Sequence, residues 1–417
     1  MKNVKIDTVL IFALLSPFIM TYRIGPGETP YWLFGLIFLG FFVYALTDLS
    51  IINLIEKTKI KIKYLLLFFL IAASIGSAFY SSIIVRRQTS PVYGVHDIIV
   101  QQESAIRFLL HGVNPYATTY FNTPLVEWGY SETEINPALY HFVMQPFYLI
   151  FAAPFYLMSA HVLFGFFDGR VPLIFLFFTL LFFAFKLVKD PGQKLLFVTL
   201  LAFNPATLGY LLEGRDDIFM YAFLFASFYF LSKGKNLLSG VLMAFAFATK
   251  QSVWPIFPFY FAYLYLRNKN LKKTLSDLIP FTVVFSVIVL PFFLWNPQAY
   301  LNSTIFYLSG NAQHSYPIAG YGLGVLLKDL NIIKNSFSYY PFWIWQIVIT
   351  VPLMIWFINW QKKENTVKRM IIVYALFLFV FWYLSRYFNN SHLGYISMLL
   401  ITAYFWPEEN TKQAKRA

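Results

Sequence analysis

Long apolar stretches recur along the whole chain, and no other feature constrains its fold as strongly. A helix needs about 20 mostly apolar residues to cross a bilayer, and fewer where it is partly shielded. By that criterion about twelve segments qualify. They cover residues 6–23, 31–54, 63–85, 169–187, 194–212, 217–232, 236–253, 254–267, 275–295, 340–360, 370–386 and 391–406. With 59% hydrophobic and 12% charged residues, the composition is also far from that of a soluble domain. The sequence therefore predicts an all-α, polytopic membrane helical bundle.

Basic side chains predict which helix ends face the cytoplasm. They gather in five short connections and at both termini. These residues are Lys57, Lys59, Lys61, Lys63; Lys186, Lys189, Lys194; Lys233, Lys235; Arg267, Lys269, Lys272, Lys273; Lys362, Lys363, Lys368, Arg369; and Lys2, Lys5, Lys412, Lys415, Arg416. Cytoplasmic loops attract Lys and Arg, so this distribution explains the formal charge of +13 without a nucleic-acid partner. We expect an integral protein of the plasma (inner) membrane, in contact with membrane lipids.

The same topology assigns two long loops to the extracytoplasmic face. Segment 63–85 leaves the cytoplasm and loop 186–194 lies inside, so an odd number of crossings must separate them. We therefore expect the apolar stretch 139–167 to form interfacial or re-entrant helices, which need protein or a water-filled cavity around them. The chain is predicted to be a single domain, 1–417. Its outer loops would cover 85–168, with interfacial helices, and 296–340.

A polar stretch interrupts the apolar pattern in the first outer loop. Residues 98–111 should form a helix with its apolar side chains on one side, lying along the membrane surface. The Gly-Val-Asn-Pro run at 112–115 should end it. Asp97 would lie at its start, beside free backbone N–H groups and the positive end of the helix dipole. Its carboxylate is a candidate for accepting a proton from a hydroxyl or for binding a cation. The alternative is that Asp97 only caps the helix.

Two neighbours of Asp97 are further candidates for substrate binding. His96 directly precedes it, and Glu103 follows within the same helix. Glu103 could instead lie on a solvated face or pair with Arg107 at i+4 spacing.

Two charged groups fall in other predicted outer turns. Arg215, Asp216 and Asp217 separate two apolar helices, and charges at membrane depth tend to mark functional sites. The two acids are candidates for a divalent-cation site and Arg215 for an anion contact; capping of the next helix is the alternative. Lys250 and Gln251 follow an apolar helix at its outer end, where the positive-inside rule does not predict a lysine. Lys250 could hold a phosphate or simply snorkel to the interface.

The last candidate group contains Arg386 and His392. Arginine suits bidentate phosphate binding, so Arg386 could form a second basic site. A snorkelling arginine beside aromatic residues would give the same pattern. A lone histidine such as His392 is more often a satisfied polar residue than a ligand or base.

These motifs together resemble the GT-C superfamily, the multi-spanning glycosyltransferases that use polyprenyl-phosphate sugars. The resemblance rests on an acid in the first outer loop, the helix after it, a second acidic turn and a Thr-Lys pair. The matching residues are Asp97, the 98–111 helix, Gly112-Val113-Asn114-Pro115-Tyr116, Arg215-Asp216-Asp217 and Ala248-Thr249-Lys250-Gln251. The last of these is similar to a motif of the α-mannosyltransferase-like branch.

The resemblance implies a transferase that moves a hexose, with mannose as the first candidate, from a polyprenyl-phosphate donor. The acceptor would be a lipid, a glycan or a protein. Asp97 would be the general base, and Lys250, Arg215 and Arg386 would support the leaving phosphate. Asp216 and Asp217 would orient the acceptor or hold a divalent cation that is not obligatory.

Two other functions compete with this interpretation. A lipid or glycolipid flippase or transporter would often show repeated halves, which this sequence lacks. An accessory subunit could bind a lipid-linked glycan without chemistry. Substitution of Asp97 discriminates, because only the enzyme should lose turnover while it keeps its fold.

Overall fold

A computed structural model describes residues 4–21, 31–49, 55–131, 134–159, 161 and 165–408. Within them the chain is mostly helical with very little strand, which follows from the need to satisfy backbone polar groups inside the segment wherever lipid replaces water. The helices of the first part are α1 (Ile6–Thr21), α2 (Tyr31–Leu46), α3 (Glu56–Ile71), α4 (Ser77–Thr89), α5 (Asp97–Leu110), α6 (Phe147–Met158), α7 (Arg170–Leu187), α8 (Pro191–Ala202), α9 (Leu208–Glu213), α10 (Asp217–Ser232) and α11 (Asn236–Phe247). Those of the second part are α12 (Phe257–Asn268), α13 (Leu271–Trp295), α14 (Pro297–Leu301), α15 (Tyr307–Ser309), α16 (Leu323–Asp329), α17 (Phe342–Lys363), α18 (Val367–Tyr383) and α19 (Asn390–Phe405).

Short irregular helices and one small sheet complete the fold. The π-helical turns are η1 (Ala72–Gly76), which joins α3 to α4, and η6 (Asn302–Phe306). The 3₁₀ turns are η2 (Pro124–Glu127), η3 (Pro137–Leu139) and η5 (Gln251–Ile256). The strands are β1 (Ala319–Gly320) and β2 (Tyr387–Phe388), which pair in parallel.

Four helices of the described residues are long and apolar enough to cross a membrane, judged by length and composition. They are Glu56–Thr89, Arg170–Leu187, Leu271–Trp295 and Phe342–Lys363. The all-α class is thus confirmed, but a count of about twelve crossings is not. The range 194–212 is wrong as one helix, because the chain leaves helical geometry between α8 and α9 at Asn204-Pro205. The predicted terminal cations Lys2, Lys412, Lys415 and Arg416, and the ends of two predicted spans at 22–23 and 50–54, lie outside the described residues.

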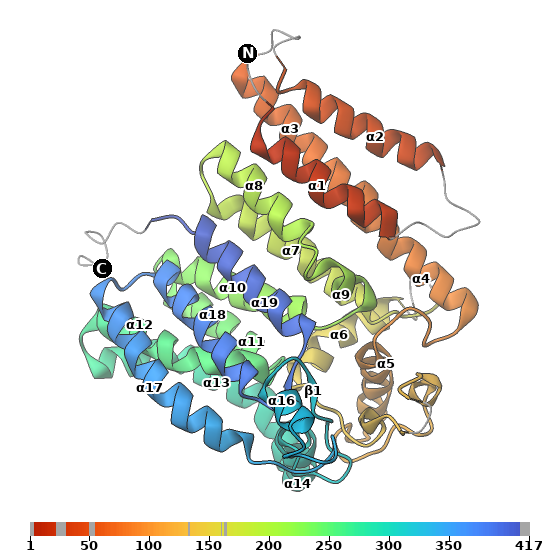
Figure 1. Ribbon diagram of the computed structural model, residues 1–417, viewed down its shortest axis with the longest axis vertical. Helices are drawn as coiled ribbons and strands as arrows, with labels where there is room; N and C mark the ends of the chain where they lie inside the picture. The colour runs from red at the N-terminus through yellow and green to blue at the C-terminus, as the bar shows by residue number, and fades with distance from the viewer. Residues whose placement is uncertain are drawn as a thin grey trace.

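The long helices lie side by side, and smaller elements gather at one end of them (Figure 1). That end carries α5, β1, α14 and α16, while α1 to α3 form the N-terminal edge. Helix α10 runs through the interior, and its residues 218–228 are all buried. A helix that is apolar on every side is buried in this way. The acidic turn at residues 215–217 directly precedes α10, so it lies at one end of a helix in the centre of the bundle.

Helix α5 differs from the prediction for 98–111. Nine consecutive residues, Ile98 to Ile106, are buried, including the polar Gln101, Gln102 and Glu103. The expectation of a surface helix with one apolar side is therefore wrong, because protein surrounds these turns on all sides. Their polar groups find partners inside: the Gln101 amide donates to the carbonyls of Ala138 and His141. The helix does end as expected, with Gly112 in the left-handed region at φ +74°.

Candidate active site

A cavity of about 470 Å³ opens at the end of the bundle that carries α5. It lies between the start of α5, η3, the α9–α10 turn, the α11–η5 turn and the β1–β2 pair. The predicted site residues in its lining are His96, Asp97, Arg215, Asp216, Asp217, Lys250, Gln251 and His392. Segments up to about three hundred positions apart in the chain thus meet at one place. The two remaining candidates, Glu103 and Arg386, do not line it.

Asp97 is the first helical residue of α5, and His96, not Asp97, occupies the cap position. The Asp97 Oδ1 atom lies 2.6 Å from His96 Nδ1, and Asn136 Nδ2 donates to Asp97 Oδ2 at 3.3 Å. His96 Nδ1 also lies 3.4 Å from the Ile98 backbone nitrogen, but a ring nitrogen that donates to Asp97 cannot accept there as well. The shorter contact is the stronger one. Asp97 is therefore held by directed hydrogen bonds at the cavity wall.

These contacts keep the Asp97 carboxyl group ionised. Burial by itself would raise its pKa, but the charge of His96 and hydrogen bonds from His96, Asn136 and the Ile98 N–H outweigh burial and lower the pKa below 3.8. The dipole of α5 also favours a negative charge in its first turn. An ionised carboxylate can only accept hydrogen bonds, so at neutral pH Asp97 is a proton acceptor.

Lys250 joins both acids of the second turn. Its Nζ atom lies 2.8 Å from Asp216 Oδ1 and 3.0 Å from Asp217 Oδ1. The backbone at Lys250 is extended after α11 ends, which directs the side chain across to the start of α10. Asp216 makes no capping hydrogen bond through its side chain, so simple capping does not explain it. Lys250 does not snorkel either, since its ammonium group is engaged by two carboxylates.

Arg215 is bound less completely than Lys250. It donates through Nε to Glu213 Oε2 at 3.2 Å, and its guanidinium lies 4.4 Å from the Tyr210 ring centroid. Gln251 has a different place, because its amide donates to the carbonyls of Val143 (2.9 Å) and Thr304 (2.8 Å). Gln251 therefore ties three segments of the cavity wall together.

Arg386 and His392 serve the local fold. The Arg386 guanidinium is buried and donates to the carbonyls of Tyr316, Ser336 and Ser338. All three guanidinium nitrogens are thus engaged by backbone carbonyls, and Arg386 does not line the cavity, so its position does not support the prediction of a second basic site. His392 reaches the cavity lining but accepts a hydrogen bond from the Asn389 N–H at 2.9 Å, in the capping box that starts α19.

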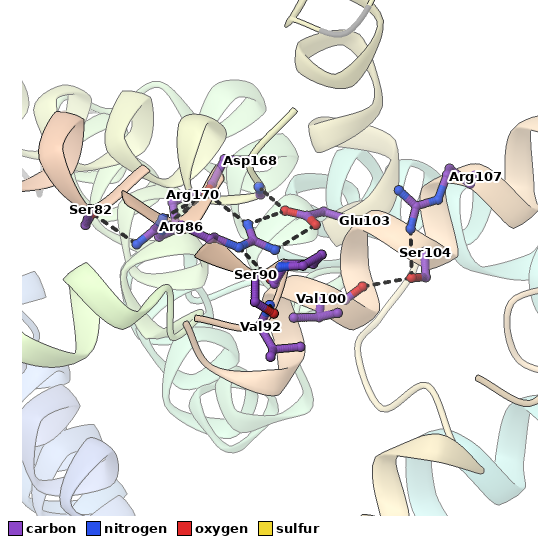
Figure 2. A network of polar contacts seen from close by, with 12 residues as sticks. Ser82, Arg86, Ser90, Val92, Val100, Glu103, Ser104, Arg107, Asp168 and Arg170 are labelled. Carbon is purple, nitrogen blue, oxygen red and sulfur yellow. Dashed lines mark hydrogen bonds and ion pairs between the residues drawn. The ribbon is translucent and has the colours of Figure 1, made fainter. Parts of the chain in front are cut away.

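Glu103 lies away from the cavity, in a buried ion cluster (Figure 2). Its two carboxylate oxygens accept from Arg86 at 2.8 and 2.9 Å. Arg107 bonds Ser104 instead. Both sequence-based alternatives for Glu103, a solvated face and a pair with Arg107, are therefore wrong.

Several residues of the lining were not among the predicted site residues. Asn136 donates a hydrogen bond to Asp97, and His141 also lines the cavity, with its Nε2 2.7 Å from the Gln313 carbonyl oxygen. A ring of aromatic side chains also faces the cavity: Trp128, Tyr130, Tyr210, Tyr307, Tyr316, Tyr321 and Tyr387. Burial raises the pKa of Tyr130 to about 12, so its hydroxyl remains a hydrogen-bond donor at neutral pH. In a chain with 21% aromatic residues, no sequence signal distinguishes these rings from those that pack the core.

The acidic residues do not form a metal cluster. Among the described residues, no group of three or more His, Asp or Glu side chains is arranged to hold a metal ion. Asp216 and Asp217 share the Lys250 ammonium, and a cation would have to displace it. The two carboxylates therefore bind the Lys250 ammonium group and not a metal ion in this arrangement.

Fold and cavity define a helical membrane protein with a polar site at one end of its bundle. The sequence profile of glycosyltransferase family 87 matches residues 142–404, which is more than half of the chain, and the chain belongs to this family. It is a GT-C-type family of membrane glycosyltransferases, so the predicted superfamily is confirmed. Membership supports a transferase that acts on a donor and an acceptor. No curated protein and no solved structure matches the chain. The matched range contains Arg215, Asp216, Asp217 and Lys250, whereas Asp97 precedes it.

Proposed function

We propose that this protein transfers a hexose from a polyprenyl-phosphate carrier to a hydroxyl group of a lipid, glycan or protein, with Asp97 as the general base. The observation that carries the proposal is the meeting of Asp97 with the Lys250–Asp216–Asp217 group in one cavity. Mannose is the first donor sugar to test, because the Thr249-Lys250 pair resembles the α-mannosyltransferase-like branch.

The chemistry is a single displacement at the anomeric carbon. The acceptor O–H gives its proton to the Asp97 carboxylate, and its oxygen forms the new bond to the sugar. The bond between the anomeric carbon and the phosphate oxygen breaks, and polyprenyl phosphate leaves with the electron pair. This direct route inverts the configuration of the anomeric carbon.

The charges of the cavity suggest separate roles for its other residues. Lys250 is already neutralised by two carboxylates, and Arg386 is used by backbone carbonyls. Arg215, bound through Nε to the Glu213 carboxylate, is therefore the best candidate to contact the leaving phosphate. Asp216 and Asp217 can accept hydrogen bonds from sugar hydroxyls. The aromatic side chains of the lining offer apolar faces for a sugar.

An extracytoplasmic site in the plasma (inner) membrane is supported by the charge distribution. The lysine-rich connections α7–α8 and α17–α18 lie on the left side of Figure 1, and α5 and β1 lie toward the lower right. Basic loops favour the cytoplasm. Under this topology the segments 85–168 and 296–340 are the two outer loops.

Asp97→Asn is the direct test. The amide keeps the size of the side chain but cannot take a proton, so transfer should fall by about 10²-fold or more. Purified protein is assayed with labelled polyprenyl-phosphate sugars, supplied one at a time with membrane lipids as acceptors. Asp329→Asn, at an exposed position, is the matched control and should keep the wild-type rate.

The pH dependence follows from the lowered pKa of Asp97. A carboxylate with a depressed pKa stays ionised until the pH falls through that value, so the rate should lose its Asp97 contribution only below about pH 4.

Wild-type turnover by Asp97→Asn would rule out Asp97 as the base. Lipid movement without transfer would favour the flippase alternative.

A further inference from the structure

Four buried charged residues form a closed cluster (Figure 2), and none of them lines the cavity. Arg86 donates to both oxygens of Glu103, and its Nη1 also lies 2.9 Å from Asp168 Oδ2. Arg170 donates to both oxygens of Asp168 at 2.9 and 2.8 Å. The arginine charges bring the pKa of Asp168 down to about 2 although burial alone would raise it. Two positive and two negative charges therefore balance inside the protein.

The cluster connects four helices. Arg86 comes from α4, Glu103 from α5, and Asp168 and Arg170 from the start of α7. Arg170 Nη1 donates to the carbonyl of Leu212 in α9 at 3.1 Å, and the Gly169 N–H donates to Glu103 Oε1 at 2.8 Å. The remaining donor of Arg86, Nε, is bound to the Pro91 carbonyl. Every guanidinium nitrogen of Arg86 and Arg170 donates at least one hydrogen bond within the protein, and four of the five N–H groups of each arginine are used.

Helix α5 and close backbone contacts connect this cluster to Asp97. Glu103 lies six residues after Asp97 on the same rigid helix, about 9 Å along its axis. The His96 N–H donates to the Glu213 carbonyl at 2.8 Å. Gly214, at φ +89°, lies directly under Ile99, and a Cβ there would come 2.3 Å from Ile99 Cγ1. Gly214 is followed directly by Arg215, Asp216 and Asp217. The start of α5, which carries Asp97, and the turn that carries Asp216 and Asp217 are therefore held together by these contacts.

We propose that this ion cluster sets the position of Asp97 relative to the Lys250–Asp216–Asp217 group, with Arg86 and Glu103 as positioning residues for the transfer reaction. The inference rests on the proposed function for its chemistry. Buried charges are compensated only while partners keep good geometry, and a bidentate arginine–carboxylate pair adds directional specificity that apolar packing lacks. A displacement of about 1 Å at a reacting group can cost about 10²-fold in rate.

Charge-preserving substitutions test this role in the full-length protein. Arg86→Lys removes the bidentate geometry, and Glu103→Asp shortens the carboxylate arm by one methylene. Arg107→Lys is the matched control, since Arg107 lies on the same helix and its side chain donates to Ser104 alone among the described residues. Two readouts are used: transfer from the polyprenyl-phosphate sugar that the wild-type protein uses, and amide hydrogen exchange of residues 95–100 and 208–214.

We expect kcat to fall by about 10-fold or more in both cluster variants, with the donor KM changed by less than about twofold. Exchange at 95–100 and 208–214 should accelerate, while α17 and α18 stay as in the wild type. Arg107→Lys should change neither readout. A lower yield of folded protein, with kcat per folded molecule unchanged, would indicate a purely structural cluster and overturn the proposal.

The outcomes also separate this inference from the proposed function. If wild-type protein transfers sugar from no donor, the proposed function fails, and exchange at 95–100 still decides whether the cluster holds Asp97. If Asp97→Asn is inactive but both cluster variants match Arg107→Lys in rate and exchange, the general base stands and the positioning role is wrong. Failure of both cluster variants to fold, with a normal Arg107→Lys protein, likewise counts against positioning.

Discussion

At the scale of single residues, each charged side chain that lines the cavity has a defined partner. Lys250 illustrates this, because its ammonium group stands between two carboxylates whose mutual repulsion it cancels. The same ammonium, if alone in an apolar bundle, would carry a large desolvation cost. The contacts of Lys250 with Asp216 and Asp217 therefore matter both for the stability of the protein and for the proposed site.

Replacing Lys250 should destabilise the protein. Lys250→Met leaves Asp216 and Asp217 side by side without a cation, and breaking such a pair costs roughly 2–3 kcal/mol when part of it, here 21% of the lysine side chain, remains exposed. Unfolding in mixed detergent measures the free-energy change. The exposed Lys328→Met serves as control.

A second substitution checks the cause of that loss. Lys250→Met combined with Asp217→Asn removes one of the two repelling charges and should recover part of the stability. If the double variant is no more stable than Lys250→Met, repulsion between the acids is not the reason for the loss.

At the scale of elements, the β1–β2 pair closes one side of the cavity. Ala319 pairs with Tyr387 and Gly320 with Phe388, which joins the segment before α16 to the segment before α19. Gly320 has φ +89°, and a Cβ there would come 2.0 Å from the Phe388 carbonyl oxygen. Only glycine fits this close approach.

Gly320→Ala should therefore lower both stability and activity. Gly94→Ala is a matched control, since Gly94 also has a positive φ, of +64°, but nothing within 4 Å of a Cβ. Both variants bear the backbone cost of about 1 kcal/mol, and only Gly320→Ala has the clash. Melting temperatures should fall further for Gly320→Ala; equal losses would show that the β1–β2 contact does not matter.

At the scale of the whole molecule, the unequal distribution of basic residues between the two ends of the bundle predicts which end faces the cytoplasm. The absence of cysteine allows single labelled positions to be introduced without background. Lys334→Cys lies in the predicted outer segment 296–340, and Lys272→Cys in a predicted inner loop; both positions are exposed.

A membrane-impermeant thiol reagent applied to intact cells should label Lys334→Cys and spare Lys272→Cys. Both should react after the membrane is opened. The reverse pattern would place the cavity end in the cytoplasm and would contradict the proposed extracytoplasmic site.

Much of the fold follows from the sequence, because a helix in lipid must satisfy its own backbone over a contiguous segment. The range 217–232 coincides with α10, and 254–267 and 391–406 each differ from α12 and α19 by three residues or fewer at either end. The pattern failed at 98–111, where the burial of Gln101, Gln102 and Glu103 depends on segments that the periodicity does not contain.

The sequence by itself determined the helical class, the superfamily and the small set of charged residues from which a site could be made. Only the tertiary structure decided which of these charges meet. Lys250 and Asp216 are 34 positions apart and Arg86 and Asp168 are 82 apart, so their pairing is a result of helix packing. A buried charge takes whichever partner the packing brings within hydrogen-bond distance, because leaving it unpaired costs more than any local preference. For this reason Asp97 lines the cavity, while Glu103, on the same helix, pairs with Arg86 in the ion cluster (Figure 2).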